Sequence, residues 1–214
     1  MTQALSITLS TFRLWWGEIV LLTLLNLAWL ALQVPIITGP PATAAMYALA
    51  RRVADGEMVG LQHGWDALRQ MFWPAWKWGA VNLLLWVVVV GNFWAYQEAV
   101  GVGWTAIKLL WGAIALAWFT LNLFYWPFWL AQTDKRLRTT LRNSLVFLLK
   151  APSLGMTLAI ISLILMVVSV VFTLPLAACL MAWLALMSVL AVDKALQAPL
   201  KDRLQTATAE EDET

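Results

Sequence analysis

The sequence contains a single cysteine, Cys179, and a single histidine, His63. One cysteine excludes an internal disulfide and a cysteine-based metal cage. His63 lies three residues before Asp66 on an expected surface helix, which favours a solvated pair over a proton shuttle. The sequence offers no nucleophile paired with a base, no phosphate-binding loop and no cluster of metal ligands. We therefore expect no catalytic site, no metal and no cofactor.

Charge is also scarce. Charged residues make up 12% of the 214 residues and hydrophobic residues 62%, against about 25% and 45–50% in soluble domains. Several apolar runs approach or exceed the ~20 residues that a helix needs to cross a bilayer. The sequence therefore predicts an all-α, polytopic transmembrane helical bundle. The first residues have neither a basic region nor a small-residue cleavage site, so we expect them to be retained.

The apolar runs predict one integral membrane domain, residues 1–195. Its expected spans are residues 15–37, 41–55, 75–97, 104–131, 153–173 and 176–192, of which 41–55 is short. Residues 196–214 are rich in charge and are expected to form a disordered cytoplasmic tail. We favour six spans, with five as the alternative.

Lysine and arginine are strongly segregated along the chain. They gather in three segments: Arg51, Arg52, Arg69 and Lys77, then Lys135, Arg136, Arg138, Arg142 and Lys150, and finally Lys194, Lys201 and Arg203. The connections 98–103 and 174–175 carry no basic residue. By the positive-inside rule, the basic segments and the C-terminus are expected in the cytoplasm. No nucleic-acid partner is needed to explain these charges.

The short segment 41–55 decides between five and six spans. Pro40 and Pro41 cannot continue a preceding helix but suit the first turn of a new one. A helix of about 15 residues reaches only ~22 Å of the ~30 Å hydrocarbon core. We favour a sixth span because the segment offers a small-residue surface for close helix packing: Gly39, Pro40, Pro41, Ala42, Thr43, Ala44, Ala45 and Ala48. Otherwise the helix lies on the inner side and the N-terminus is outside.

Two amphipathic segments, residues 59–73 and 135–150, each precede a span and belong to a weak internal repeat. The second has Leu137, Leu141, Leu145 and Leu148 on one helical face. We expect both segments to lie as helices along the cytoplasmic interface. The residues expected to contact lipid headgroups or a partner protein are basic: Arg51, Arg52, Lys135, Arg136, Arg138 and Arg142.

Three asparagines fall within the predicted spans: Asn26, Asn82 and Asn122. Buried asparagines usually act as interhelical hydrogen-bond donors and acceptors, but these three also suit a binding site for a polar solute. Trp104, Trp111, Trp118 and Tyr125 recur every seven residues along one predicted helix. This stripe is read first as a packing or lipid-facing seam, and alternatively as an aromatic platform for apolar sugar faces beside Asn122.

The stretch "NLAWLALQVPIITGPPATAAMYALARRVADGE", residues 26–57, resembles the signature of the YesL-like family of bacterial membrane proteins. The later stretch "FYWPFWLAQTDKRLRTTLRNSLVFLLKAP" is also similar to that family, although Pro40-Pro41 and the fifteen tryptophans depart from it. The resemblance implies a bacterial cytoplasmic membrane protein associated with carbohydrate uptake. The family is a domain of unknown function and supplies no catalytic residues.

These observations favour a non-enzymatic accessory protein of the membrane, linked to carbohydrate uptake. Its expected partners are membrane lipid and either a membrane transporter component or a second copy of the chain. The alternative is a small solute transporter or channel that uses the intramembrane asparagines and aromatic residues.

Overall fold

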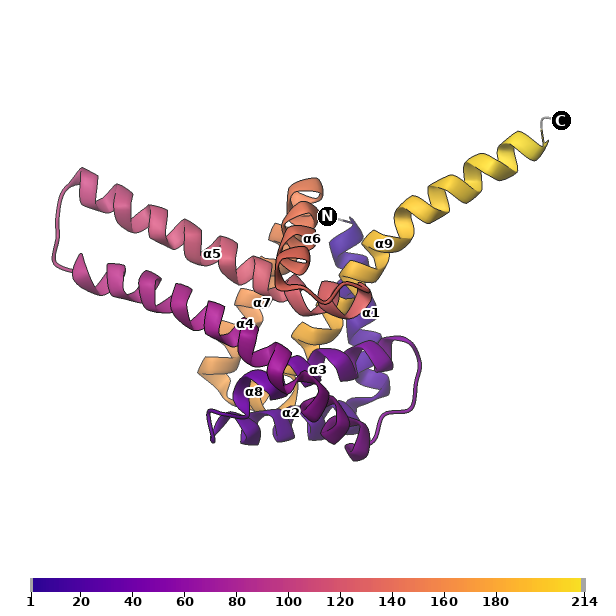
Figure 1. The fold of residues 1–214 in the computed structure, drawn as a ribbon, viewed down its shortest axis with the longest axis horizontal. Coiled ribbons are helices and arrows are strands. Elements are labelled where there is room, and N and C mark those ends of the chain that lie inside the picture. Colours follow the sequence, from indigo (N-terminus) through magenta and orange to yellow (C-terminus); the bar gives the residue numbers. More distant parts are fainter. Residues whose placement is uncertain (1, 213–214) are drawn as a thin grey trace.

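The structure, a computed structural model, describes residues 2–212, without the side chains of residues 2, 174, 176 and 198–212. All regular elements in this range are helices (Figure 1). They are α1 (Thr2–Gly17), α2 (Ile19–Gln33), α3 (Gly39–Ala54), α4 (Leu61–Ala95), α5 (Val102–Ala131), α6 (Leu137–Lys150), α7 (Pro152–Phe172), α8 (Leu174–Ala178) and α9 (Leu180–Asp212). The predicted all-α class is confirmed.

Four helices among the described residues are long and apolar enough to cross a membrane: α4, α5, α7 and residues 180–197 of α9. The helix pair α1 and α2 counts as a fifth if it is one broken span. The chain is thus a polytopic helical protein, but six spans of this kind are not found. The predicted short span is α3, whose 16 residues rise only ~24 Å.

The predicted first span, residues 15–37, contains α2, but the chain bends near its start. α1 ends at Gly17, and α2 begins at Ile19 at an angle of 94° to it. Glycine is a poor helix former, and a charged glutamate follows it, so the break falls at the weakest point of the segment. α1 lies against α9, with Ser6 next to Lys194 and Trp15 near Trp183. The two helices are therefore antiparallel.

α3 is the central helix of the fold. Ten of its 16 residues are buried, including Gly39, Pro41, Ala42, Ala44 and Ala45. It packs against α2, α4, α5 and α9. Small side chains allow this close approach of backbones, which is how helices associate in membranes. At the crossing with α4, a Cβ on Gly79 would lie 3.3 Å from Cβ of Pro40, so this position favours glycine.

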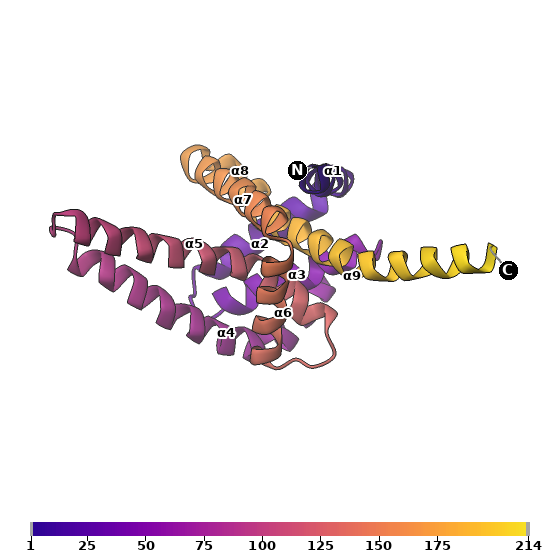
Figure 2. The ribbon, with the colours of Figure 1, turned by 90° about the horizontal axis from the view of Figure 1, so that it is seen from above.

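α4 and α5 form an antiparallel arm. The C-terminal half of α4 and the N-terminal half of α5 lie side by side and extend away from the other helices in both views (Figures 1 and 2). The predicted separate interfacial helix 59–73 is wrong, because α4 runs unbroken from Leu61 through Pro74 to Ala95. One missing backbone hydrogen bond at a proline is tolerated when neighbouring groups compensate, as in transmembrane helices. α5 matches the predicted span 104–131 closely.

α6 matches the predicted amphipathic segment, but its predicted leucine face is packed only in part. Leu137, Leu141 and Leu148 are partly buried against the core. The buried residues are Thr140, Ser144 and Phe147, whereas Leu145 is 49% exposed. Thr140 and Ser144 hydroxyls donate to carbonyls of their own helix, which satisfies them inside the protein. Small and hydroxyl-bearing residues allow close helix contacts in membranes, so the fully buried positions of α6 include Thr140 and Ser144, which the leucine pattern does not predict.

The last predicted span, residues 176–192, is interrupted near its start. α8 ends at Ala178, and α9 begins at Leu180. α9 stays helical to Asp212, whereas composition predicts disorder from residue 196. Alanine, leucine, glutamine and glutamate in this stretch are strong helix formers. α7 begins and ends within one residue of its predicted bounds.

Candidate functional site

A cavity of about 670 Å³ lies between α2, α3, α4, α5, α7 and α9. Its size is in the range of small-molecule sites, which are mostly apolar with a few polar groups. Four of its lining residues are tryptophans and four are polar side chains of other types. These are Trp29, Trp76, Trp78 and Trp126, with Gln33, Thr43, Asn82 and Asn122. The cavity is the main candidate for a binding site.

The cavity brings together two of the three predicted asparagines. Asn82 accepts a hydrogen bond from Trp118 Nε1 at 2.9 Å and donates to Trp78 O at 3.0 Å, so it joins α4 to α5. Asn122 donates to Trp118 O at 2.9 Å. Within the described residues, its Oδ1 accepts no hydrogen bond. Asn122 is therefore the side chain best placed to receive a donor from a ligand.

Asn26 lies outside this cavity and has a structural position. It is fully buried, and its Oδ1 accepts from the backbone nitrogens of Met181 at 2.8 Å and Ala182 at 3.2 Å. Its Nδ2 donates to Ala177 O at 2.7 Å. The first backbone N–H groups of a helix have no partner within the helix. Asn26 of α2 thus caps α9 from another helix and bridges the break after α8.

The part of the aromatic stripe formed by Trp118 and Tyr125 packs against α4. Tyr125 stacks on Trp78 of α4 with ring centroids 3.7 Å apart, and Trp118 lies 5.3 Å from the same ring. Trp111 is farther along the arm and only partly buried. None of the three stripe residues lines the cavity. The cavity tryptophans come instead from α2, α4 and α5, and sequence spacing alone gives no signal that they converge.

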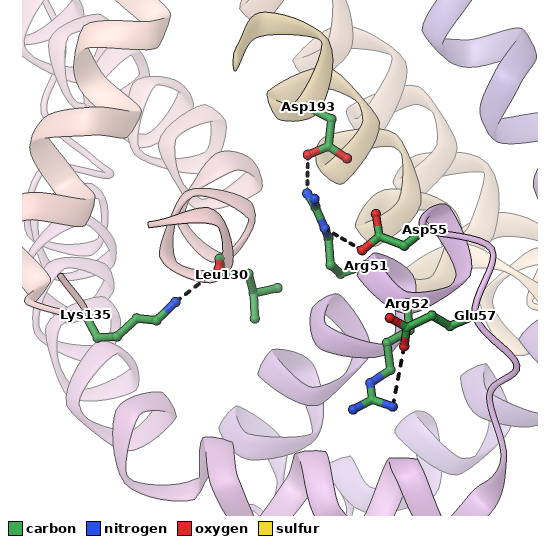
Figure 3. Close-up of polar contacts among 7 residues, drawn as sticks. All are labelled: Arg51, Arg52, Asp55, Glu57, Leu130, Lys135 and Asp193. Atoms are coloured by element: carbon green, nitrogen blue, oxygen red, sulfur yellow. Dashed lines mark hydrogen bonds and ion pairs between the residues drawn. The ribbon is translucent and has the colours of Figure 1, made fainter. Parts of the chain in front are cut away.

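Arg51 pairs with two carboxylates, one directly after the end of α3 and one on α9 (Figure 3). Its Nη1 pairs with Asp193 of α9 and its Nε with Asp55 at 3.0 Å. The side chains of Arg51 and Asp193 are 34% and 17% exposed. Asp193 lies one residue beyond the predicted span 176–192 and was not predicted as a site residue. The signal that could have identified it is an acidic residue directly after an apolar run. Arg52 makes a looser, more exposed contact with Glu57 at 3.7 Å.

The remaining predicted contact residues divide into two groups. Lys135 donates to the carbonyls of Trp129 and Leu130 at 2.6 and 3.1 Å, at the end of α5, and partial burial lowers its pKa. Arg136 lies 3.6 Å from Asp134. Arg138 and Arg142, by contrast, are exposed, and in the described part of the chain neither forms an ion pair.

Among the described residues, no three histidine, cysteine, aspartate or glutamate side chains lie together as metal ligands would. Cys179, next to the α8–α9 break, is free and half-buried. The site therefore consists of an apolar and aromatic cavity with a few amides, and of a separate set of cations near helix ends.

Comparison with known proteins gives one match. No curated protein and no solved structure matches the chain. A family model described as protein of unknown function, DUF624, matches residues 22–93, which is about a third of the chain. The match covers α3 and most of α2 and α4. This part of the chain is similar to that family.

Proposed function

We propose that the chain is a non-enzymatic membrane protein of the YesL-like type that binds a partner protein in the membrane through its α4–α5 arm. The supporting observation is how little of the arm is enclosed. In the apolar 18-residue segment of each helix, only 11% of the residues of α4 and 17% of those of α5 are buried, against 61% for α9. Membrane helices associate through packing, and this arm leaves two helices with most of their surface open to a further helix. The resemblance to the YesL-like family suggests a carbohydrate importer as the partner.

Site-specific crosslinking in native membranes tests this proposal. A photoreactive amino acid replaces Leu84 of α4 or Leu109 of α5, which are 68% and 70% exposed. The control is Ile164 of α7, which is apolar and 58% exposed. We expect a discrete protein adduct from the two arm positions and only lipid adducts from Ile164. No protein adduct from the arm, or the same adduct from all three positions, contradicts the proposal.

For the topology we propose a bacterial cytoplasmic membrane with both termini in the cytoplasm. The Nζ of Lys194 lies 2.6 Å from Ser6 Oγ, so the start of α1 is next to the end of the apolar part of α9. This contact supports an even number of crossings with both termini on one side. We propose six, of which α1 and α3 are short, and α1 then takes the place of the predicted first span, residues 15–37. Basic residues near Arg51 and Lys194 then share the inner side.

Cysteine labelling of intact cells checks this orientation. In a chain with Cys179→Ala, we expect Gln97→Cys to react with an impermeant maleimide from outside. We expect Gln3→Cys and Gln197→Cys to react only after permeabilisation. All three positions are exposed. Labelling of Gln3→Cys in intact cells means that the N-terminus is outside and supports five spans instead.

A second candidate function is solute binding or transport through the central cavity, favoured by the position of Asn122. Asn122 lines an aromatic-rich space of about 670 Å³, and its Oδ1 accepts no hydrogen bond within the described residues. We expect uptake of labelled monosaccharides by purified protein in liposomes, reduced about tenfold by Asn122→Leu through loss of one hydrogen-bond acceptor. Asn92→Leu, on the exposed arm, is the control. Equal flux through both variants and empty liposomes rules this candidate out.

A further inference from the structure

The exposed face of α6 combines two exposed cations with an apolar groove. Arg138, Arg142, Leu145 and Leu149 are spaced four, three and four residues apart, which places them on one face of the helix. All four are exposed, while the opposite face, with Thr140, Ser144 and Phe147, is buried against the protein. The exposed face thus has a basic end and an apolar end.

The apolar end opens into a groove. A cavity of about 410 Å³ lies between α5, α6 and the start of α7. Leu145 and Leu149 form one side, and Ile114, Ala117 and Leu121 of α5 form another. On α6 the groove is lined by residues of the C-terminal half, Leu145, Leu148 and Leu149. Arg142 is one helical turn from Leu145, at a rise of about 1.5 Å per residue.

The basic end has no acidic partner among the described residues. Asp134 is the one acidic residue between positions 132 and 150, and it contacts Arg136 at 3.6 Å and Thr139 at 2.8 Å. Lys135 is occupied by carbonyls of α5. Two guanidinium groups therefore remain for an external anion. Arginine suits a phosphate because its planar donors bind two oxygens at once.

We propose that this surface binds an anionic phospholipid, with its phosphate at Arg138 and Arg142 and one acyl chain in the groove beside Leu145 and Leu149. The two arginines complement the negative phosphate of a lipid, and the apolar groove complements its acyl chain. The two parts of one lipid therefore match the two parts of the surface. α6 then lies where headgroups and acyl chains meet. This inference does not depend on the proposed partner or on the central cavity.

Native mass spectrometry of the full chain in neutral detergent tests the headgroup. The probes are dioleoyl phosphatidylglycerol and dioleoyl phosphatidylcholine. We expect tighter binding of the anionic lipid than of the neutral one. Arg138→Gln/Arg142→Gln should weaken binding of the anionic lipid about 10- to 30-fold, because each cation contributes a factor of roughly five to the affinity. Arg138→Lys/Arg142→Lys keeps the charges but loses the paired donors, so its binding should fall between that of the unchanged chain and that of the glutamine variant. The control Arg69→Gln/Lys77→Gln removes two exposed cations of α4 and should change binding less than twofold.

A second variant tests the groove with the charges intact. Ala117→Phe fills space next to the groove, whereas Ala80→Phe places the same side chain on an exposed position of α4. We expect only Ala117→Phe to weaken phosphatidylglycerol binding. Glycerol 3-phosphate, which has no acyl chain, should not compete. Unchanged binding in the arginine or groove variant, an equal loss in either control, or full competition by glycerol 3-phosphate overturns the proposal.

Discussion

Replacing Asn26 with leucine is expected to lower the free energy of unfolding by about 2 kcal/mol. The change removes a fully buried cap and leaves the N–H groups of Met181 and Ala182 without their acceptor. A single interhelical hydrogen bond in a membrane protein contributes only ~0.6 kcal/mol on average. The expected loss is larger because three hydrogen bonds among the described residues disappear, and a buried unpaired donor costs about 1–3 kcal/mol.

Thermal unfolding of the purified protein in detergent, followed by tryptophan fluorescence, measures this effect. Asn92→Leu is the matched control, because Asn92 donates to Val88 O of its own helix and, in the described part of the chain, to no other helix. The control should change stability by less than about 0.5 kcal/mol. If the two variants unfold at the same temperature, Asn26 does not hold the start of α9.

Breaking the Arg51–Asp193 pair is expected to destabilise the protein by about 2 kcal/mol for each single substitution, Arg51→Met or Asp193→Leu. Either change leaves one charge partly buried without its partner, and breaking a fully buried pair costs about 3–5 kcal/mol. The expected value is lower because the arginine is about a third exposed and also contacts Asp55. The double variant should be less destabilised than the sum of the two singles.

A double-mutant cycle isolates this coupling, measured by the same unfolding experiment. We expect a coupling energy of about 1–2 kcal/mol for Arg51 and Asp193, and of at most ~0.5 kcal/mol for the control pair Arg52 and Glu57. The control pair is farther apart, at 3.7 Å, and its side chains are 46% and 55% exposed. Additive effects of Arg51→Met and Asp193→Leu rule out a link between α3 and α9 through this pair.

The sites differ in how far local sequence predicts them. The sequence predicts Asn82 and Asn122 as candidate site residues, because an amide in an apolar run needs a hydrogen-bond partner. The roles of the asparagines do not follow from it. Asn26 and Asn82 are alike in type and setting, yet one caps a helix more than 150 positions away and the other accepts from Trp118 at the cavity. The seven-residue spacing likewise predicts the aromatic stripe, but it does not predict that Trp78 of α4 stacks on it.

The sequence by itself determined the class of this protein. Long apolar runs and scarce charge require helices, because backbone groups in lipid must be satisfied within the segment. It also determined the bounds of α3, α5 and α7 to within about two residues, since prolines, glycines and changes in polarity mark those ends.

Tertiary structure decided the breaks and the faces. The bend after Gly17 and the unbroken passage through Pro74 depend on whether neighbouring helices satisfy the interrupted backbone. The buried face of α6 and the pairing of Arg51 with Asp193 depend on which helices meet. Periodicity in one segment carries no information about these contacts, because it describes a helix without its surroundings.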